Sequence, residues 1–199
     1  YLQHVSHFFL KFFSLFLRGN KFEDPINGKT YRKLLPYGRL KSRENAIAPD
    51  SLSLERHRLM WLFLKNKTNF FTDKLKFLHI APEYCFINIF KNMSNLDYLT
   101  ADLNSPWADI KMDVHNIQFN DNTFDVIICN HVLEHVEDYK FFINELERVS
   151  SKGYIELPTI LEDNLVFENK KDHLWHMEFD DDNNKLIISK KIQFLEPVL

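Results

Sequence analysis

Residues 124–135 read Phe-Asp-Val-Ile-Ile-Cys-Asn-His-Val-Leu-Glu-His, and this stretch decides the fold. Its first part, residues 124–130, is a short, nearly continuous apolar run, which predicts a strand that is buried on both faces. Such strands are typical of parallel sheets that helices cover on both sides. The polar residues that follow, beginning with Asn130, then stand at the carboxyl end of the strand, where open parallel sheets bind their ligands.

Further short apolar runs alternate with helical stretches on either side of this strand. The expected strands are residues 75–80, 98–103, 109–112 and 153–157, and the expected helices are residues 84–93 and 138–149. This alternation implies right-handed crossovers and a mostly parallel sheet. Residues 173–179 and 185–190 flank the polar link at residues 180–184, which predicts a C-terminal antiparallel hairpin. The fold class is therefore an α/β sandwich of the Rossmann-like type.

The first 18 residues predict a helix with one narrow polar stripe on an apolar cylinder. One interpretation is a helix that lies in a membrane interface and gives the protein a peripheral membrane contact. We favour the other, a helix that packs on the domain or on a partner subunit, because the polar face is thin and weakly charged.

A turn-rich segment follows at residues 19–50, with three of the four glycines and little periodicity. Ser53 is expected to cap a helix at residues 54–64. We therefore divide the chain into an N-terminal extension, residues 1–52, and an α/β domain, residues 53–199.

The composition excludes few classes of protein. The chain has 199 residues and a formal net charge of −3, which gives no general attraction to nucleic acid or membranes. Basic residues gather between residues 18 and 43, and we interpret them as a solvated face rather than a site for a phosphate-bearing partner. The two cysteines lie in apolar contexts and favour a reduced, cytoplasmic chain.

Two acidic residues follow neighbouring strands of the predicted sheet. Asp102 ends the strand at residues 98–103, where a carboxylate can accept hydrogen bonds from both hydroxyls of a ribose. Asp113 follows the next strand and could meet the exocyclic amine of an adenine. Either residue could instead form a turn or cap a helix. Together they predict a site for an adenosine-containing ligand.

These segments resemble the class I S-adenosylmethionine-dependent methyltransferases, in the branch of small-molecule enzymes. The resemblance lies in residues 78–83 (Leu-His-Ile-Ala-Pro-Glu), 101–103 (Ala-Asp-Leu), 113–114 (Asp-Val) and 124–136, and it covers roughly residues 74–158. It implies S-adenosylmethionine as the cofactor. The cofactor-binding residues it implies are His79, Ala81, Pro82, Glu83, Asp102, Leu103, Asp113, Val114, Asn130 and His131.

Within this resemblance, the loop at residues 79–85 passes the methionine part of the cofactor, and Asp102 holds the ribose. Asp113 and Val114 edge the adenine, while Asn130 and His131 lie near the sulfonium. The family's first loop usually carries glycines that let the backbone approach the cofactor, but this loop has none. Ala81 stands at one of the positions where a glycine is common.

A second resemblance concerns residues 24–58, which look like an N-terminal extension that forms a zinc ribbon in one subgroup of the family. The four positions of the zinc-binding cysteines are occupied here by Asp24, Asn27, Ala48 and Ser51. Structural zinc requires thiolate or imidazole ligands, so we expect no zinc there and a segment held by packing instead.

Histidines offer a further metal hypothesis. His131 and His135 are four residues apart and would share one helical face, as in some metal sites. We favour the family's arrangement instead, in which His131 lines the cofactor pocket and His135 turns towards the sheet, and we expect no metal site. Residues 173–176 (His-Leu-Trp-His) either line the acceptor pocket or begin a strand packed on the core.

The predicted function is methyl transfer to a small-molecule or glycan acceptor, including a sugar linked to a lipid. His131, or Glu134 in its place, is the candidate base that receives the acceptor's proton. The alternative is an inactive methyltransferase fold that serves as a binding or scaffold protein. The absence of a Gly-x-Gly-x-x-Gly sequence argues against a nicotinamide-dependent dehydrogenase.

Overall fold

A computed structural model describes residues 10, 14–38, 42–166 and 171–192. The chain divides into two compact units, Tyr1–Asp73 and Lys74–Leu199. The boundary that we expected after residue 52 therefore falls inside the first unit. Each unit is described by itself below.

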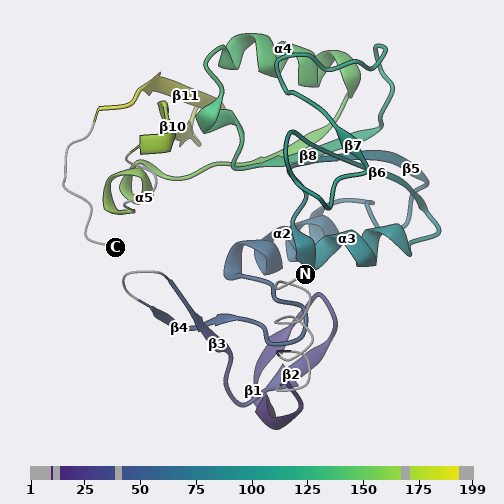
Figure 1. The fold of residues 1–199 in the computed structure, drawn as a ribbon, viewed down its shortest axis with the longest axis vertical. Coiled ribbons are helices and arrows are strands. Elements are labelled where there is room, and N and C mark those ends of the chain that lie inside the picture. The colour runs from purple at the N-terminus through teal and green to yellow at the C-terminus, as the bar shows by residue number, and fades with distance from the viewer. Residues whose placement is uncertain (1–9, 11–13, 39–41, 167–170, 193–199) are drawn as a thin grey trace. The chain divides into compact units, whose positions relative to one another are not determined.

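A five-stranded parallel sheet forms the centre of the second unit, in the order β7-β6-β5-β8-β9. Its strands are β5 (Leu75–Ile80), β6 (Leu96–Asp102), β7 (Ile110–Lys111), β8 (Val126–Asn130) and β9 (Gly153–Glu156). Helix α3 (Tyr84–Lys91) connects β5 to β6, and α4 (Tyr139–Val149) connects β8 to β9. Figure 1 shows these two helices on opposite faces of the sheet. The predicted Rossmann-like α/β fold is confirmed.

Strand β5 shows how the sequence produces two buried faces. Successive side chains of a strand point to opposite sides, so Phe77 and His79 share one face while Leu78 and Ile80 share the other. Phe77 and His79 pack with aromatic rings of α3 and β6, including Phe90 at centroid distances of 5.6 and 6.3 Å. Because β5 is apolar on both sides, both of its faces can be buried. Its sequence therefore lacks the alternation of apolar and polar residues that marks a half-buried strand.

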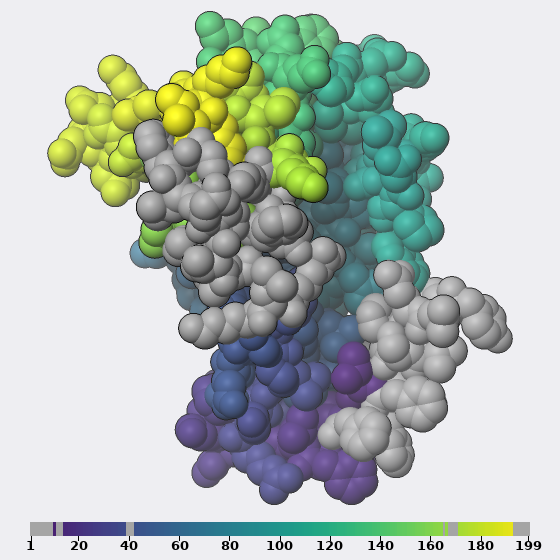
Figure 2. Space-filling view, turned by 60° about the vertical axis from the view of Figure 1, so that its left-hand side comes forward, coloured from purple at the N-terminus to yellow at the C-terminus, as the bar shows by residue number. Residues whose placement is uncertain are grey.

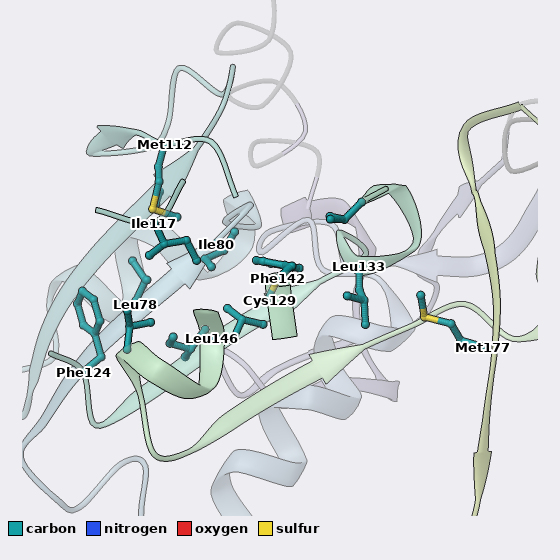
Figure 3. Packing of buried hydrophobic residues seen from close by; sticks show 14 residues of the cluster. Leu78, Ile80, Met112, Ile117, Phe124, Cys129, Leu133, Phe142, Leu146 and Met177 are labelled. Atoms are coloured by element: carbon teal, nitrogen blue, oxygen red, sulfur yellow. The ribbon is translucent and has the colours of Figure 1, made fainter. Parts of the chain in front are cut away.

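The opposite face of the sheet carries the larger hydrophobic core, under α4 (Figure 3). Phe142, Leu146 and Val149 recur at helical spacing along α4 and are all buried. The helix begins where Asp138 caps it, its carboxylate accepting the Phe141 N–H at 3.0 Å. Other members of this core are Leu78, Ile80, Ile127, Cys129, Leu133 and Met177.

The predicted C-terminal hairpin is present as β10 (Trp175–Asp180) paired antiparallel with β11 (Lys185–Lys190). Figure 2 shows it at the molecular surface in yellow-green and yellow. Between β9 and the hairpin lies the short helix α5 (Ile160–Leu165), which Thr159 caps through the Glu162 N–H at 3.2 Å. The 3-10 turn η2 (Leu133–His135) precedes α4 and contacts β10.

The first unit contains two antiparallel hairpins and a helix. Strand β1 (Arg18–Asp24) pairs with β2 (Lys29–Tyr31), β3 (Leu35–Tyr37) pairs with β4 (Arg43–Ile47), and α2 (Glu55–Lys67) follows. The segment predicted to be turn-rich with little periodicity contains these four strands, which are too short to show a periodicity of two in the sequence.

The start of α2 also differs from the expectation. Its N-cap is Leu54, and the His57 Nδ1 accepts the Leu54 N–H at 3.1 Å. The Ser53 hydroxyl is used elsewhere, because it accepts a hydrogen bond from Ser51 Oγ at 2.9 Å and donates one to Asp24 at 3.4 Å. A capping side chain was therefore available in the sequence, but a tertiary contact competes for it.

Most of the helix predicted at residues 1–18 lies outside the described residues, so its proposed membrane contact remains a prediction. Its end is corrected, because Leu15–Leu17 forms the 3-10 turn η1 and Arg18 begins β1. Among the described residues, no helix has both the length and the apolar character needed to cross a membrane.

Candidate active site at the carboxyl ends of the central strands

Strands β5 and β8 are neighbours, and the chain leaves them in opposite directions. From β5 it runs through α3 to β6, and from β8 it runs through α4 to β9 on the other side. The strand order therefore reverses between β5 and β8. In open α/β sheets this switch point is where ligands bind, beyond the carboxyl ends of the strands.

The residues just beyond both strand ends adopt an unusual backbone conformation. Ala81 has φ of 52° and His131 has φ of 53°, in the left-handed region that costs a residue with a Cβ about 1–2 kcal/mol. The Ala81 N–H donates to the carbonyl of Ala101, and the His131 N–H donates to that of Glu156, both at 2.9 Å. Ala81 thus retains a glycine-like backbone although this loop contains no glycine.

Glu83 joins the two strand ends. Its Oε1 accepts the Asn130 amide at 2.8 Å, and its Oε2 lies 2.6 Å from Nε2 of His79. Because a carboxylate only accepts hydrogen bonds, Nε2 of His79 is the donor. His79 is fully buried and its Nδ1 lies 3.0 Å from the Tyr98 hydroxyl. His79 therefore faces the α3 side of the sheet and orients Glu83 rather than lining an open crevice.

The next strand end along the sheet carries Asp102. Its Oδ1 accepts the backbone N–H groups of Asn104 at 2.7 Å and Ser105 at 2.6 Å, so one oxygen stabilises the turn after β6. Its Oδ2 accepts no hydrogen bond from the described residues. Asp102 and Leu103 line a hollow of about 220 Å³ that continues along residues 104–111. The turn-forming and ligand-binding interpretations of Asp102 are therefore compatible.

Asp113 lies beside Asp102 through the backbone, because the Met112 N–H donates to the Asp102 carbonyl at 3.0 Å. The Asp113 carboxylate is exposed and accepts the backbone N–H of His115 at 2.9 Å. This hydrogen bond and the His115 ring lower the pKa of Asp113. Val114 is half-buried against the core under α4. Asp113 therefore lies at the strand end expected of it, with its carboxylate engaged in a local turn.

The two candidate bases have different environments. The His131 side chain is about one quarter exposed, with Nδ1 3.3 Å from Glu134 and Nε2 3.4 Å from Glu156. The Glu134 side chain is fully buried. Glu156 was missed in the sequence, although it lies next to the end of the strand predicted at residues 153–157 and the rule that selected Asp102 would have found it. His131 is thus the better placed of the two to meet an acceptor.

The expected positions of the other histidines require correction. Residues 131–135 do not form an α-helix, because His131 has a positive φ and η2 is a 3-10 turn, so His131 and His135 do not share a helical face. His135 is exposed and does not turn towards the sheet. Its Nδ1 lies 2.9 Å from the Asp172 carbonyl, and its ring packs edge-on to that of His173.

Residues 173–176 lead into a strand packed on the core, which was the second of the two interpretations given for them. Trp175 begins β10, and His176 is buried. Both His173 and His176 contact the buried carboxylate of Asp163, at 2.5 and 3.4 Å. Asp163 could not be found in the sequence, because α5 and β10 come together only in the folded chain.

Burial also sets the titration of groups close to the strand ends. It raises the pKa of the Tyr98 hydroxyl far above its usual range, with the Glu83 carboxylate adding to the effect. It raises the pKa of Tyr154 on β9 to about 12, again with nearby Glu156. Burial likewise raises the pKa of the Cys129 thiol. These groups therefore remain protonated at neutral pH and serve packing or hydrogen bonding.

In the first unit, two turns with polar side chains face each other. Asn27 donates to Asp50 at 3.2 Å, Asp24 accepts from Ile26 N at 3.2 Å, and Lys29 pairs with Asp50. The four positions aligned with zinc ligands are Asp24, Asn27, Ala48 and Ser51. The turns are joined by the Asn27–Asp50 hydrogen bond, by the hydrogen bond that Ser53 donates to Asp24, and by the Lys29–Asp50 ion pair.

Residues 73–155 match the family model described as a methyltransferase domain. The matched residues make up less than half of the chain, and the match indicates S-adenosylmethionine as the cofactor. An uncharacterized protein of Methanocaldococcus jannaschii is 28% identical over 123 residues, which are 50% of this chain and 54% of that protein. The chain thus spans about half the length of this relative.

Solved structures give weaker similarities. A protein of Pyrococcus horikoshii has 17% identity and a TM-score of 0.40, with 74% of this chain and 79% of that chain covered. A SAM-dependent methyltransferase of Methanosarcina mazei has 15% identity and a TM-score of 0.38, with 61% and 74% covered. No functional conclusion rests on these two similarities.

The residues at the strand ends fit the cofactor that the family match indicates. A ribose needs an acceptor for its hydroxyls, and Asp102 offers Oδ2 beside a hollow. Close approach to a cofactor needs a backbone that bends sharply, and Ala81 supplies the left-handed conformation that glycine usually provides.

Proposed function

We propose that this chain is a class I methyltransferase that transfers a methyl group from S-adenosylmethionine to a small-molecule or sugar acceptor, including lipid-linked sugars. One observation supports this most directly. Side chains from four adjacent strand ends, β7, β6, β5 and β8, gather beside the point where the strand order reverses. The cofactor would supply a methyl group on a positively charged sulfur, so the protein's task is chiefly to align two reactants.

The cofactor would be held by residues from these strand ends. Asp102 would accept from the ribose, with Leu103 beside the hollow that it lines. Asp113 and Val114 would edge the adenine, and the loop containing Ala81, Pro82 and Glu83 would pass the methionine part. His79 would act through Glu83, and Asn130 would be held in position by the same carboxylate.

The acceptor would be met by His131. Its ring lies between the carboxylates of Glu134 and Glu156, with Nδ1 3.3 Å from the first and Nε2 3.4 Å from the second. We propose His131 as the base and, because Glu134 is fully buried, no longer favour Glu134 in that role. A groove of about 590 Å³ lies between the end of β9, α5 and the hairpin, lined by mostly apolar residues such as Leu157, Met177 and Phe179. This groove suits an acceptor with an apolar part.

Cofactor binding is tested by calorimetric titration of the full chain with S-adenosylmethionine and S-adenosylhomocysteine. The Asp102→Asn variant keeps the amide oxygen that can accept the N–H groups of Asn104 and Ser105, but loses the charge. We expect micromolar binding by the wild type and at least a ~10-fold loss in the variant. Asp97→Asn, an exposed position at the opposite end of β6, is the matched control and should bind like the wild type.

The base is tested with labelled S-adenosylmethionine and a panel of small-molecule, sugar and lipid-linked acceptors. His131→Ala should lower turnover by ~10²-fold or more while cofactor affinity is retained. Unchanged turnover would exclude His131 as the base without touching the proposed cofactor site.

A specific observation favours a second candidate function, an inactive methyltransferase fold that binds a partner. Glu83 is hydrogen-bonded to both central strand ends, and one Asp102 oxygen is engaged in its own turn. If neither ligand binds to the wild type, this scaffold function replaces the enzyme. The N-terminal unit would then be a degenerate zinc-ribbon-like module. The two cysteines of the chain are buried in the second unit, which suits a cytoplasmic protein under either function.

A further inference from the structure

Glu134, His135 and His173 form a cluster beside η2, on the far side of His131 from β9. Each offers one ligand atom, and these atoms all lie within 4.8 Å of one another. Glu134 and His135 are consecutive in η2, and the backbone of Glu134 is joined to the segment just before β10, because its carbonyl accepts the Leu174 N–H at 2.8 Å. The cluster is therefore fixed by the fold rather than by chance contact of long side chains.

The carboxylate of Glu134 carries the inference. The side chain is fully buried, and neither oxygen accepts a hydrogen bond from the described residues. The Nδ1 of His131 lies 3.3 Å from Oε1 without the alignment of a hydrogen bond. A buried carboxylate without donors is strongly unfavourable unless a cation meets it. A site that supplies a cation would remove this cost.

Both histidines are oriented as metal ligands usually are. The Nδ1 of His173 lies 2.5 Å from the Asp163 carboxylate, and the Nδ1 of His135 lies 2.9 Å from the Asp172 carbonyl. Both partners can only accept hydrogen bonds, so each Nδ1 carries the proton and each Nε2 keeps its lone pair. Metal-binding histidines typically have one nitrogen held in this way by a carboxylate or a carbonyl, which fixes the ring for the metal.

We infer that Glu134, His135 and His173 bind a divalent transition-metal ion such as Zn²⁺. Two imidazoles and one carboxylate suit zinc and its first-row neighbours, whereas Mg²⁺ and Ca²⁺ prefer oxygen ligands alone. Ligand atoms lie about 2.0–2.2 Å from a zinc ion, so the cluster must close slightly around it, and the exposed His135 ring can move to do so. Three protein ligands leave one coordination position for water or another ligand.

This inference goes beyond methyl transfer and does not depend on it. It replaces the expectation that the chain has no metal site. The pairing considered in the sequence, His131 with His135, required an α-helix that the chain does not form here. The third ligand, His173, lies just before β10, some forty residues later, and only the folded chain brings it to η2.

The test is a metal titration of the full chain after dialysis against a chelator. Calorimetry with Zn²⁺ and visible absorption with Co²⁺ should each report one strong equivalent, and excess Mg²⁺ should not displace it. His135→Ala carries the test, because this side chain is exposed and its loss should leave the fold intact. We expect its Zn²⁺ affinity to fall by ~100-fold or more, since loss of even an outer partner costs ~10–100-fold.

Two further variants and a control sharpen the result. Glu134→Gln keeps the size of the side chain and should lose affinity to the same extent. Asp163→Asn should lose ~10–100-fold, because Asp163 orients His173 without touching the ion. His115→Ala removes an exposed histidine outside the cluster and should bind like the wild type. Circular dichroism without metal shows that each variant is folded.

Two outcomes would overturn the inference. The first is a wild-type chain that binds no Zn²⁺ or Co²⁺ above the level of the buffer. The second is strong binding that His135→Ala and Glu134→Gln leave unchanged, which would place the ion elsewhere, including in the N-terminal unit. Either result leaves the proposed cofactor site untouched, because that site is tested by the titration with S-adenosylmethionine.

Discussion

Replacing Glu83 tests whether one carboxylate holds the two central strand ends together. In Glu83→Ala the His79 Nε2–H and the Asn130 amide lose their acceptor. Both donors are buried, with 0% of His79 and 4% of Asn130 exposed. The Asn130 amide oxygen would still accept the Glu156 N–H at 3.1 Å, so the pairing of β8 with β9 is not directly removed.

The magnitude follows from these two donors. Leaving a buried donor without a partner costs about 1–3 kcal/mol, so two donors cost about 2–6 kcal/mol. The Glu83 side chain is 11% exposed, and water entering the vacated space should restore part of this loss. We therefore expect about 2–4 kcal/mol for Glu83→Ala. Glu83→Gln retains one acceptor oxygen and the side-chain volume, and should cost about 1–2 kcal/mol.

The assay is urea unfolding of the wild type and both variants at neutral pH. Because the chain has two compact units, hydrogen exchange measured on peptides from β5 and β8 should accompany it, so that the loss is assigned to the second unit. With a slope of about 2 kcal/mol per molar urea, Glu83→Ala should lower the midpoint by about 1–2 M. Glu147→Ala, at an exposed position of α4, is the control and should change stability by less than about 0.5 kcal/mol. Equal midpoints for Glu83→Ala and the control would refute the bridging role of Glu83.

Three further predictions concern the same unit. Ala81→Gly should stabilise the chain by about 0.5–1 kcal/mol in the same urea assay, because glycine adopts a positive φ without the cost that a Cβ imposes; a loss of stability would contradict the left-handed conformation. Burial opposes it, but hydrogen bonds from Lys91 and Thr100 lower the pKa of Asp109. The contribution of Asp109 to the stability of the fold is therefore complete above its pKa in the unfolded chain. This contribution is lost as the pH falls through the lower pKa of the folded chain. Urea midpoints measured from about pH 5 down to about pH 2 should therefore fall less steeply for Asp109→Asn than for the wild type, and parallel curves would disprove the linkage. Cys129 should resist alkylation in the native chain and react only in denaturant, because burial raises its pKa and excludes the reagent; rapid native labelling detected by mass spectrometry would show an open site.

Much of the fold follows from local patterns in the sequence. The apolar run at residues 124–130 predicted a buried strand, and β8 occupies Val126–Asn130. The strand at residues 75–80 and the helix after Asp138 were located closely, because continuous apolar runs and helical spacing each depend on near neighbours. The short strands of the first unit were missed, since three to seven residues carry too little pattern.

The candidate site was predictable only in part. Asp102, Asp113 and Asn130 stand at the ends of β6, β7 and β8 along one edge of the sheet, and this follows from the rule that parallel strands share one carboxyl edge. The sequence could not show that Glu83 would bridge His79 and Asn130, because that depends on which side chains the packed strands bring within reach.

The sequence by itself determined the class of fold, the edge of the sheet at which ligands are expected, and the acidic residues at that edge. Only the tertiary structure decided which side chains meet across elements, such as Glu156 with His131 and Asp163 with His173. The physical reason is that periodicity and turn chemistry act over a few residues. A buried carboxylate such as Glu134, by contrast, comes within 4.8 Å of His173, which is distant in the chain and close only after folding.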